Sequence, residues 1–123
     1  MNNLYVVESP LQALCALELS LSKSHEKHGV IVRPSGGLRI RNDEQILSVI
    51  YKVKWDYLYL MYYSKYGASL LNHLYARKVL KNTKRRFENK VNNLYLGEFR
   101  SSFMQMIRCA VNAEEDHLLD DGS

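Results

Sequence analysis

The stretch LYVVESPLQ, residues 4–12, sets the fold class of this chain of 123 residues. Its four leading apolar or aromatic residues predict a short buried strand. Ser9 can then cap a helix, Pro10 occupies the first turn, where its missing N–H costs nothing, and Gln12 can complete a capping box. The sequence therefore predicts a helix over residues 10–22. Because this helix is apolar on most sides, we expect it to be well buried.

Hydrophobic periodicity alternates between strand and helix character along the rest of the chain. The apolar run over residues 57–63 does not alternate between apolar and polar residues, which is typical of a strand covered on both faces in a parallel sheet. A second helix is expected after a cap at Asn42, and a third with Leu70, Leu71, Leu74 and Tyr75 facing inward. The predicted strands are residues 4–7, 30–32, 57–63, 93–96 and 117–119, and the other predicted helices cover about 67–81 and 100–112.

Five strands that alternate with four helices indicate an α/β fold with a doubly wound, five-stranded parallel sheet, which is Rossmann-like. Right-handed crossovers place the helices on both faces of such a sheet. The sequence has no internal repeat, linker or composition shift, so residues 1–123 are interpreted as one domain.

The composition of the chain argues against a membrane-spanning, secreted or metal-binding protein. No apolar run approaches the roughly 20 residues needed to cross a bilayer, and the N-terminus lacks a basic n-region, so we expect a cytoplasmic protein. Cys15 and Cys109 fall on apolar helix faces and are expected to be reduced, buried thiols rather than a disulfide. The four histidines show no metal-ligand spacing, so no metal site is predicted.

The chain is mildly basic, with 17 Lys and Arg against 13 Asp and Glu and a net charge of +4, which favours an anionic partner. A basic run over residues 81–90 leads into the fourth strand. Such runs are usually solvated, and the alternative is contact with an anionic membrane surface or an acidic glycan at Lys84, Arg85 and Arg86. Phe87 is the one aromatic residue inside the run, so nucleic-acid binding is not expected.

Ligands of open α/β sheets bind at the carboxyl ends of the strands, where polar turns of this sequence gather. Gly36-Gly37 lacks the spacing of a dinucleotide-binding loop, so a flexible loop is favoured over a phosphate site there. The residues predicted to bind substrate at this edge are Glu8, Ser9, Gln12, Gly36, Gly37, Gly97, Arg100, Ser101, Gly122 and Ser123.

Asp120-Asp121-Gly122 is the most specific feature of the sequence. Adjacent carboxylates repel each other, and partial burial can raise the pKa of one member of such a pair. A carboxylate so placed can act as a general base toward a hydroxyl, and Gly122 permits close approach of a ligand. The alternative is a solvated acidic turn.

Two segments together resemble bacterial sialyltransferases, in particular the lipooligosaccharide sialyltransferases and the capsule polysialyltransferases. Residues 4–14 resemble their opening strand and first helix, where a small residue precedes Pro-Leu-Gln. Residues 119–123 resemble their motif of two acidic residues followed by Gly. The resemblance implies one half of a glycosyltransferase with two Rossmann-like domains. It also implies an inverting, metal-independent transfer of sialic acid from CMP-sialic acid to a cell-surface glycan, with no other cofactor.

The family's catalytic base carries over to Asp121, with Asp120 the less favoured choice, and Ser123 matches a small hydroxyl residue near the reaction centre. The family also holds the donor phosphate with a His-Pro pair and a run of Ser and Thr in a C-terminal domain. No histidine of this sequence precedes proline. We therefore expect the C-terminal donor-binding domain to be absent and residues 1–123 to be inactive alone, so whether the chain is an enzyme stays open.

Two other interpretations of the sequence remain. One is a non-catalytic, flavodoxin-like binding or dimerisation module, and the other is a nucleotide-binding domain of another enzyme that uses the Gly36-Gly37 loop. A domain built to face a partner exposes apolar surface, so we expect a homo-oligomer. The basic run also raises the expectation of a peripheral location at the inner face of the membrane.

Overall fold

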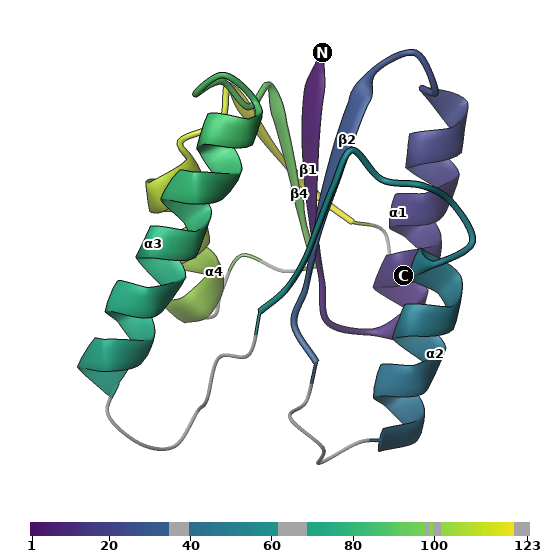
Figure 1. Ribbon diagram of the computed structural model, residues 1–123, viewed down its shortest axis with the longest axis horizontal. Coiled ribbons are helices and arrows are strands. Elements are labelled where there is room, and N and C mark those ends of the chain that lie inside the picture. Colours follow the sequence, from purple (N-terminus) through teal and green to yellow (C-terminus); the bar gives the residue numbers. More distant parts are fainter. Residues whose placement is uncertain (35–39, 62–68, 98, 100–101, 120–123) are drawn as a thin grey trace.

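A five-stranded parallel sheet lies between two pairs of helices in the computed structural model, which describes residues 1–34, 40–61, 69–97, 99 and 102–119 (Figure 1). The strands within this described part are β1 (Asn2–Val7), β2 (Lys27–Val32), β3 (Tyr57–Leu60), β4 (Asn93–Leu96) and β5 (Glu115–Leu118). The helices are α1 (Pro10–Ser22), α2 (Ile40–Ile50), α3 (Ser69–Arg86) and α4 (Ser102–Val111).

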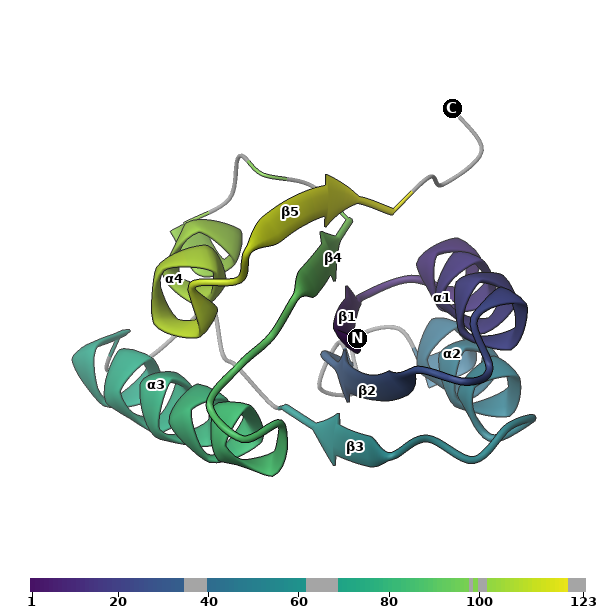
Figure 2. The same ribbon diagram turned by 90° about the horizontal axis from the view of Figure 1, so that it is seen from above.

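The strand order is β3-β2-β1-β4-β5, and every neighbouring pair is parallel. The chain steps outward from β1 to β3, and α3 then carries it back to β4 on the other side of β1. Helices α1 and α2 cover one face of the sheet, and α3 and α4 cover the other (Figure 2). The predicted α/β, doubly wound, Rossmann-like arrangement is confirmed.

Two apolar cores lie on opposite faces of the sheet, and β1 contributes to both. Leu4 and Val6 pack among the residues of α3 and α4, whereas Tyr5 and Val7 pack beneath α1 and α2. Successive strand side chains point to opposite faces, so a central strand with helices on both sides needs apolar residues at every position. This explains the uninterrupted apolar run at the start of the sequence.

Helix α1 begins and ends where the sequence predicts. The Ser9 hydroxyl accepts a hydrogen bond from the Gln12 backbone N–H at 3.2 Å, and Pro10 fills the first helical position. The prediction that the whole helix is well buried was wrong, because Leu11, Leu14 and Leu21 are 46%, 40% and 58% exposed. One side of α1 packs on the sheet, and no element of the described chain covers its outer side.

Helix α3 is longer than predicted, and the residues on its inward face differ from the predicted ones. It continues to Arg86 because Lys and Arg are good helix formers, and the first backbone break comes at Glu88 and Asn89, with φ of 57° and 61°. Leu74 and Tyr75, which were predicted to face inward, are 56% and 44% exposed. The buried face carries Ala76, Val79, Leu80 and Thr83 instead, and the side chains of Leu70 and Leu71 lie outside the described residues.

Several predicted element ends shift by a few residues. β2 begins at Lys27, so His28 and Gly29 belong to the strand rather than to a preceding turn. α2 begins at Ile40, so Asn42 lies inside the helix and cannot be its cap. α4 covers residues 102–111 of the predicted 100–112, and its Phe103, Ile107 and Val111 are buried against the sheet.

Gly29 allows Phe87 to close the amino end of the core on the α3 side. A Cβ atom at position 29 would lie 2.6 Å from Phe87 Cζ and 3.3 Å from Tyr57 Cβ. Phe87 is 1% exposed and so has little room to move aside. The ring and the glycine therefore depend on each other.

We expect Gly29→Ala to lower the free energy of unfolding by about 1–3 kcal/mol, because the added methyl group overpacks the core against Phe87. Urea denaturation followed by circular dichroism measures this change. In Gly29→Ala/Phe87→Leu the smaller side chain relieves the collision, so the combined loss should be less than the sum of the two single losses. Strictly additive losses would contradict the proposed contact.

Candidate functional site

The strand order reverses between β1 and β4, and the carboxyl ends of these two neighbours mark the position where open α/β sheets bind ligands. Val6 of β1 pairs with Leu96 of β4 in the parallel register, so the turns that follow the two strands start side by side. This edge is the lower end of the sheet in Figure 1. We define the carboxyl-edge site as Glu8, Ser9, Gln12, Arg33 and Gly97.

Gln12 joins the two turns. Its Oε1 accepts the Glu8 backbone N–H at 2.9 Å, which reaches one residue beyond the usual partner in a capping box. The carboxamide also lies against Gly97, where an added Cβ would collide with the side-chain nitrogen, carbon and oxygen of Gln12. Only glycine at position 97 permits this close approach, so the turn after β1 and the turn after β4 are in direct contact.

Arg33 holds the Glu8 carboxylate at this edge. Arg33 Nη1 donates to Glu8 Oε2 at 3.0 Å, and the two side chains are only 10% and 30% exposed. The guanidinium carbon lies 4.2 Å from the centre of the Phe103 ring, a cation–π contact from the start of α4. The Arg33 backbone N–H donates to Val7 O at 2.9 Å, which ties the residue after β2 to the end of β1.

Sequence reasoning did not include Arg33 among the site residues. A signal was present, since a cation directly follows the apolar strand at the edge where ligands bind. Such a charge is expected to find a carboxylate, but the pairing with Glu8, 25 positions earlier, appears only in the fold.

The structure brings four of the predicted substrate-binding residues together, namely Glu8, Ser9, Gln12 and Gly97. Leu119 is the last described residue, and its backbone N–H donates to Leu96 O at 2.6 Å, so the chain after β5 leaves at the same edge. The other predicted site residues lie outside the described residues: Gly36, Gly37, Arg100, Ser101, Asp120, Asp121, Gly122 and Ser123.

The Glu8 carboxylate held by Arg33 is suited to binding hydroxyl groups. A carboxylate held by an arginine keeps acceptor oxygens in a fixed direction, and charge-assisted hydrogen bonds from hydroxyls to such oxygens are short and strong. Glu8 is 30% exposed, so a ligand can approach it from solvent. Nothing in these residues by itself performs a bond-breaking step.

A second polar cluster lies on the face of the sheet below α1 and toward its amino edge. The rings of His28, Tyr5, Tyr95 and His117 stack in sequence across β2, β1, β4 and β5, with centroid distances of 5.8, 4.8 and 4.8 Å. His28 Nε2 donates to the Lys23 carbonyl at 2.7 Å, so its Nδ1 accepts from the Tyr5 hydroxyl at 3.0 Å.

The buried polar atoms of this aromatic cluster all have hydrogen-bond partners. Burial, followed by the nearby Tyr95 and Glu26, raises the pKa of Tyr5 above its ordinary value of 10.0. The hydrogen bond from Asn3 lowers the pKa of Glu26 below its ordinary 4.5. Among the described residues, no buried side-chain nitrogen or oxygen lacks a hydrogen-bond partner. We interpret the cluster as structural, since its buried polar atoms are already hydrogen-bonded within the protein.

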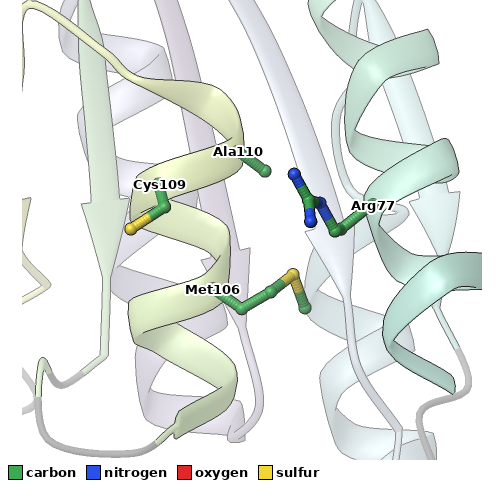
Figure 3. Close-up of a pocket in the computed structure, with 4 residues that line it drawn as sticks. All are labelled: Arg77, Met106, Cys109 and Ala110. Carbon is green, nitrogen blue, oxygen red and sulfur yellow. The ribbon is translucent and has the colours of Figure 1, made fainter. Parts of the chain in front are cut away.

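A shallow pocket of about 280 Å³ lies between α3 and α4, lined by Arg77, Met106, Cys109 and Ala110 (Figure 3). Cys109 is exposed and Cys15 is half-buried, so the prediction of two buried thiols was wrong, although both are free of disulfides. Cys15 packs at the edge of the core beneath α1 and α2, whereas Cys109 lies on the outer side of α4.

The described part of the chain contains no group of three or more His, Cys, Asp or Glu side chains that could hold a metal ion. Within the same residues, no helix is both long and apolar enough to cross a membrane.

No protein-family model, curated protein or solved structure matches the chain. The resemblance to sialyltransferases therefore depends on the two short motifs at residues 4–14 and 119–123.

We expect Glu8 and Arg33 to be energetically coupled, because their ion pair is partly buried and supported by Phe103. In a double-mutant cycle with Glu8→Gln and Arg33→Gln, urea denaturation should give a coupling energy of about 1–2 kcal/mol. The exposed Lys90–Glu114 pair, with N···O 3.3 Å, serves as the matched control and should show much weaker coupling. Equal coupling in the two pairs would contradict a special role for Arg33.

Proposed function

We propose that the chain is the acceptor-binding half of a bacterial glycosyltransferase that transfers sialic acid from CMP-sialic acid to a cell-surface glycan. The observation that carries the proposal is the contact between the Ser9-Pro10-Leu11-Gln12 turn and Gly97 at the switch point of a Rossmann-like sheet. The strand that precedes the Asp120-Asp121-Gly122 motif ends at the same edge. The nucleotide-sugar donor favours a reaction in the cytoplasm.

The acceptor glycan would bind at the carboxyl-edge site. Glu8 accepts hydrogen bonds from sugar hydroxyls, and Arg33 keeps that carboxylate correctly directed. Gln12 sets the distance between the turns after β1 and β4, so it positions Glu8 without contacting substrate in this scheme. Gly97 leaves room for this packing.

Asp121 would act as the general base. As the acceptor hydroxyl oxygen bonds to the anomeric carbon of sialic acid, its proton passes to the Asp121 carboxylate. The bond between that carbon and the phosphate oxygen breaks, and CMP leaves with the electron pair, which inverts the configuration. The donor would be held mainly by a second domain, and Asp120 is the less favoured base.

One observation favours a different class of function. Leu11, Leu14 and Leu21 are exposed on α1 at positions 11, 14 and 21, which fall along one side of a helix. An apolar side of this kind can pair with a second copy, as in a non-catalytic, flavodoxin-like dimerisation module.

Glycan binding to this chain tests the acceptor-binding proposal directly. We expect oligosaccharides released from bacterial lipooligosaccharide and capsule to shift the ¹⁵N–¹H resonances of Glu8, Gln12 and Gly97. Resonances at the amino edge, such as that of Asn93, should stay unchanged. Glu8→Gln should weaken binding roughly 10-fold, because it removes a charge-assisted acceptor.

Glu18→Gln is the control for this titration, since Glu18 is an exposed carboxylate on the same helix as Gln12. An equal loss of affinity in Glu18→Gln would show that only net charge matters. Absence of any shift, together with a concentration-dependent dimer in sedimentation, would favour the dimerisation module.

A form of the protein that also carries a donor-binding domain tests the chemistry. We expect Asp121→Asn to lower turnover roughly 10²- to 10⁴-fold, because the amide keeps the shape but loses the basic oxygen. Release of CMP from CMP-sialic acid measures turnover, and donor affinity should barely change. A larger loss in Asp120→Asn than in Asp121→Asn would reverse the assignment within the pair.

A further inference from the structure

The positive charge of the chain is concentrated on α3. This helix carries six cations and no carboxylate, although the whole chain has a net charge of only +4. The remaining residues therefore have a small net negative charge. The six cations are Arg77, Lys78, Lys81, Lys84, Arg85 and Arg86.

These cations lie mostly on the outer side of the helix. Lys78, Lys81 and Arg85 are all exposed and follow one another along a single stripe, three and four residues apart. Within the described part of the chain, none of the six cations of α3 forms an ion pair with a carboxylate. Like charges at this spacing destabilise a helix, and a solvated surface helix usually relieves them with acidic residues between. Only the three cations of the last turn are favoured by the negative end of the helix dipole. The charge of Arg77, Lys78 and Lys81 lacks this compensation and points to an external anionic partner.

Apolar and aromatic groups accompany the charge. Leu74 is 56% exposed and belongs to the same stripe, four residues before Lys78. Tyr75 is 44% exposed, and its hydroxyl hydrogen-bonds that of Tyr59 at 2.6 Å, which fixes the ring beside β3. Exposed leucine and tyrosine next to cations are typical of surfaces that lie at a membrane–water interface.

The shape of this surface fits a flat lipid surface better than a linear polymer. Eighteen residues of helix extend about 27 Å, and α3 forms an outer side of the molecule (Figure 2). The pocket beside it, which Arg77 and Met106 help to line (Figure 3), has a volume of about 280 Å³ and is too small to hold a long stretch of a polysaccharide or a nucleic acid. Base stacking would need several exposed rings, whereas the described outer side of α3 offers Tyr75 alone.

We propose that the outer side of α3 docks on an anionic lipid bilayer. Lys78, Lys81 and Arg85 would face the headgroups, with Leu74 at the level of the interface. Cations near such a surface are attracted over a distance of about one screening length, so several acting together give reversible binding. This inference depends on the charge and exposure of α3 and holds whether or not the chain binds glycans.

Vesicle co-sedimentation of the 123-residue chain tests the proposal. We expect binding to phosphatidylcholine vesicles that contain about 30 mol% phosphatidylglycerol, no binding to pure phosphatidylcholine, and release at high salt. Lys78→Gln/Lys81→Gln/Arg85→Gln should lower the partition coefficient roughly 10- to 100-fold. Leu74→Ser should lower it several-fold without any change in charge.

Arg41→Gln/Lys52→Gln/Lys54→Gln is the matched control, because these three cations are also exposed and the net charge falls by the same amount. It should bind within twofold of the unmodified chain. Circular dichroism and urea denaturation confirm that each variant is folded. Equal losses in the two triple variants, or full binding by the α3 variant, would overturn the proposal. Binding to dextran sulfate without binding to the anionic vesicles would overturn it in favour of a polymeric partner.

Discussion

The hydrogen-bonded position of β1 between β2 and β4 is the constraint on which the rest of the structure depends. Its residues pair in parallel with β2 over Asn2–Val7 and with β4 over Asn3–Val6. Apolar side chains from Leu4 to Val7 are fully buried, alternately under the two pairs of helices. Any residue with a charged side chain in this run would leave that charge in one core or the other without water. Both layers of helices therefore have to form around this one strand.

The same strand determines where the candidate site lies. Two residues, Glu8 and Ser9, separate the end of β1 from the start of α1, so the cap of the helix and the end of the strand share one short turn. Glu8 in this turn is fixed by its backbone bond to Gln12 and by the guanidinium of Arg33. A turn held from both sides changes little in shape when a ligand binds, which lowers the entropic cost of recognition.

Local signals in the sequence were sufficient for α1 and for the class of fold. Ser9, Pro10 and Gln12 act within four positions, so the start of α1 could be predicted, and the alternation of strands and helices predicted the parallel sheet. The end of α3 was missed because Lys84 to Arg86 are good helix formers that also resemble a solvated loop. The prediction of its inward face was wrong because Leu74 is more apolar than Thr83. In the structure Leu74 is exposed, whereas Thr83 is buried and its hydroxyl is hydrogen-bonded to that of Tyr57 at 3.0 Å.

The Glu8–Arg33 pair could not be predicted, because it requires the relative positions of two strands. Topology alone places both residues at one edge, but many residues share that edge. Phe103 selects the direction of the guanidinium, and it comes from a helix some 70 positions further along the chain. A pairing that depends on three distant segments has no local pattern in the sequence.

The contact between Trp55 and Tyr5 has an optical consequence. Trp55 is the one tryptophan of the chain, is 8% exposed, and meets the Tyr5 ring edge-on at a centroid distance of 5.8 Å. Its indole N–H donates to the Ile50 carbonyl at 2.8 Å, so the ring is fixed between the end of α2 and the central strand. Indole emission is sensitive to solvent, and tyrosines at this range transfer excitation to it. The tryptophan emission of the chain therefore comes from a single site in the core beneath α1 and α2, and it separates the loss of that layer from changes around α3 and α4.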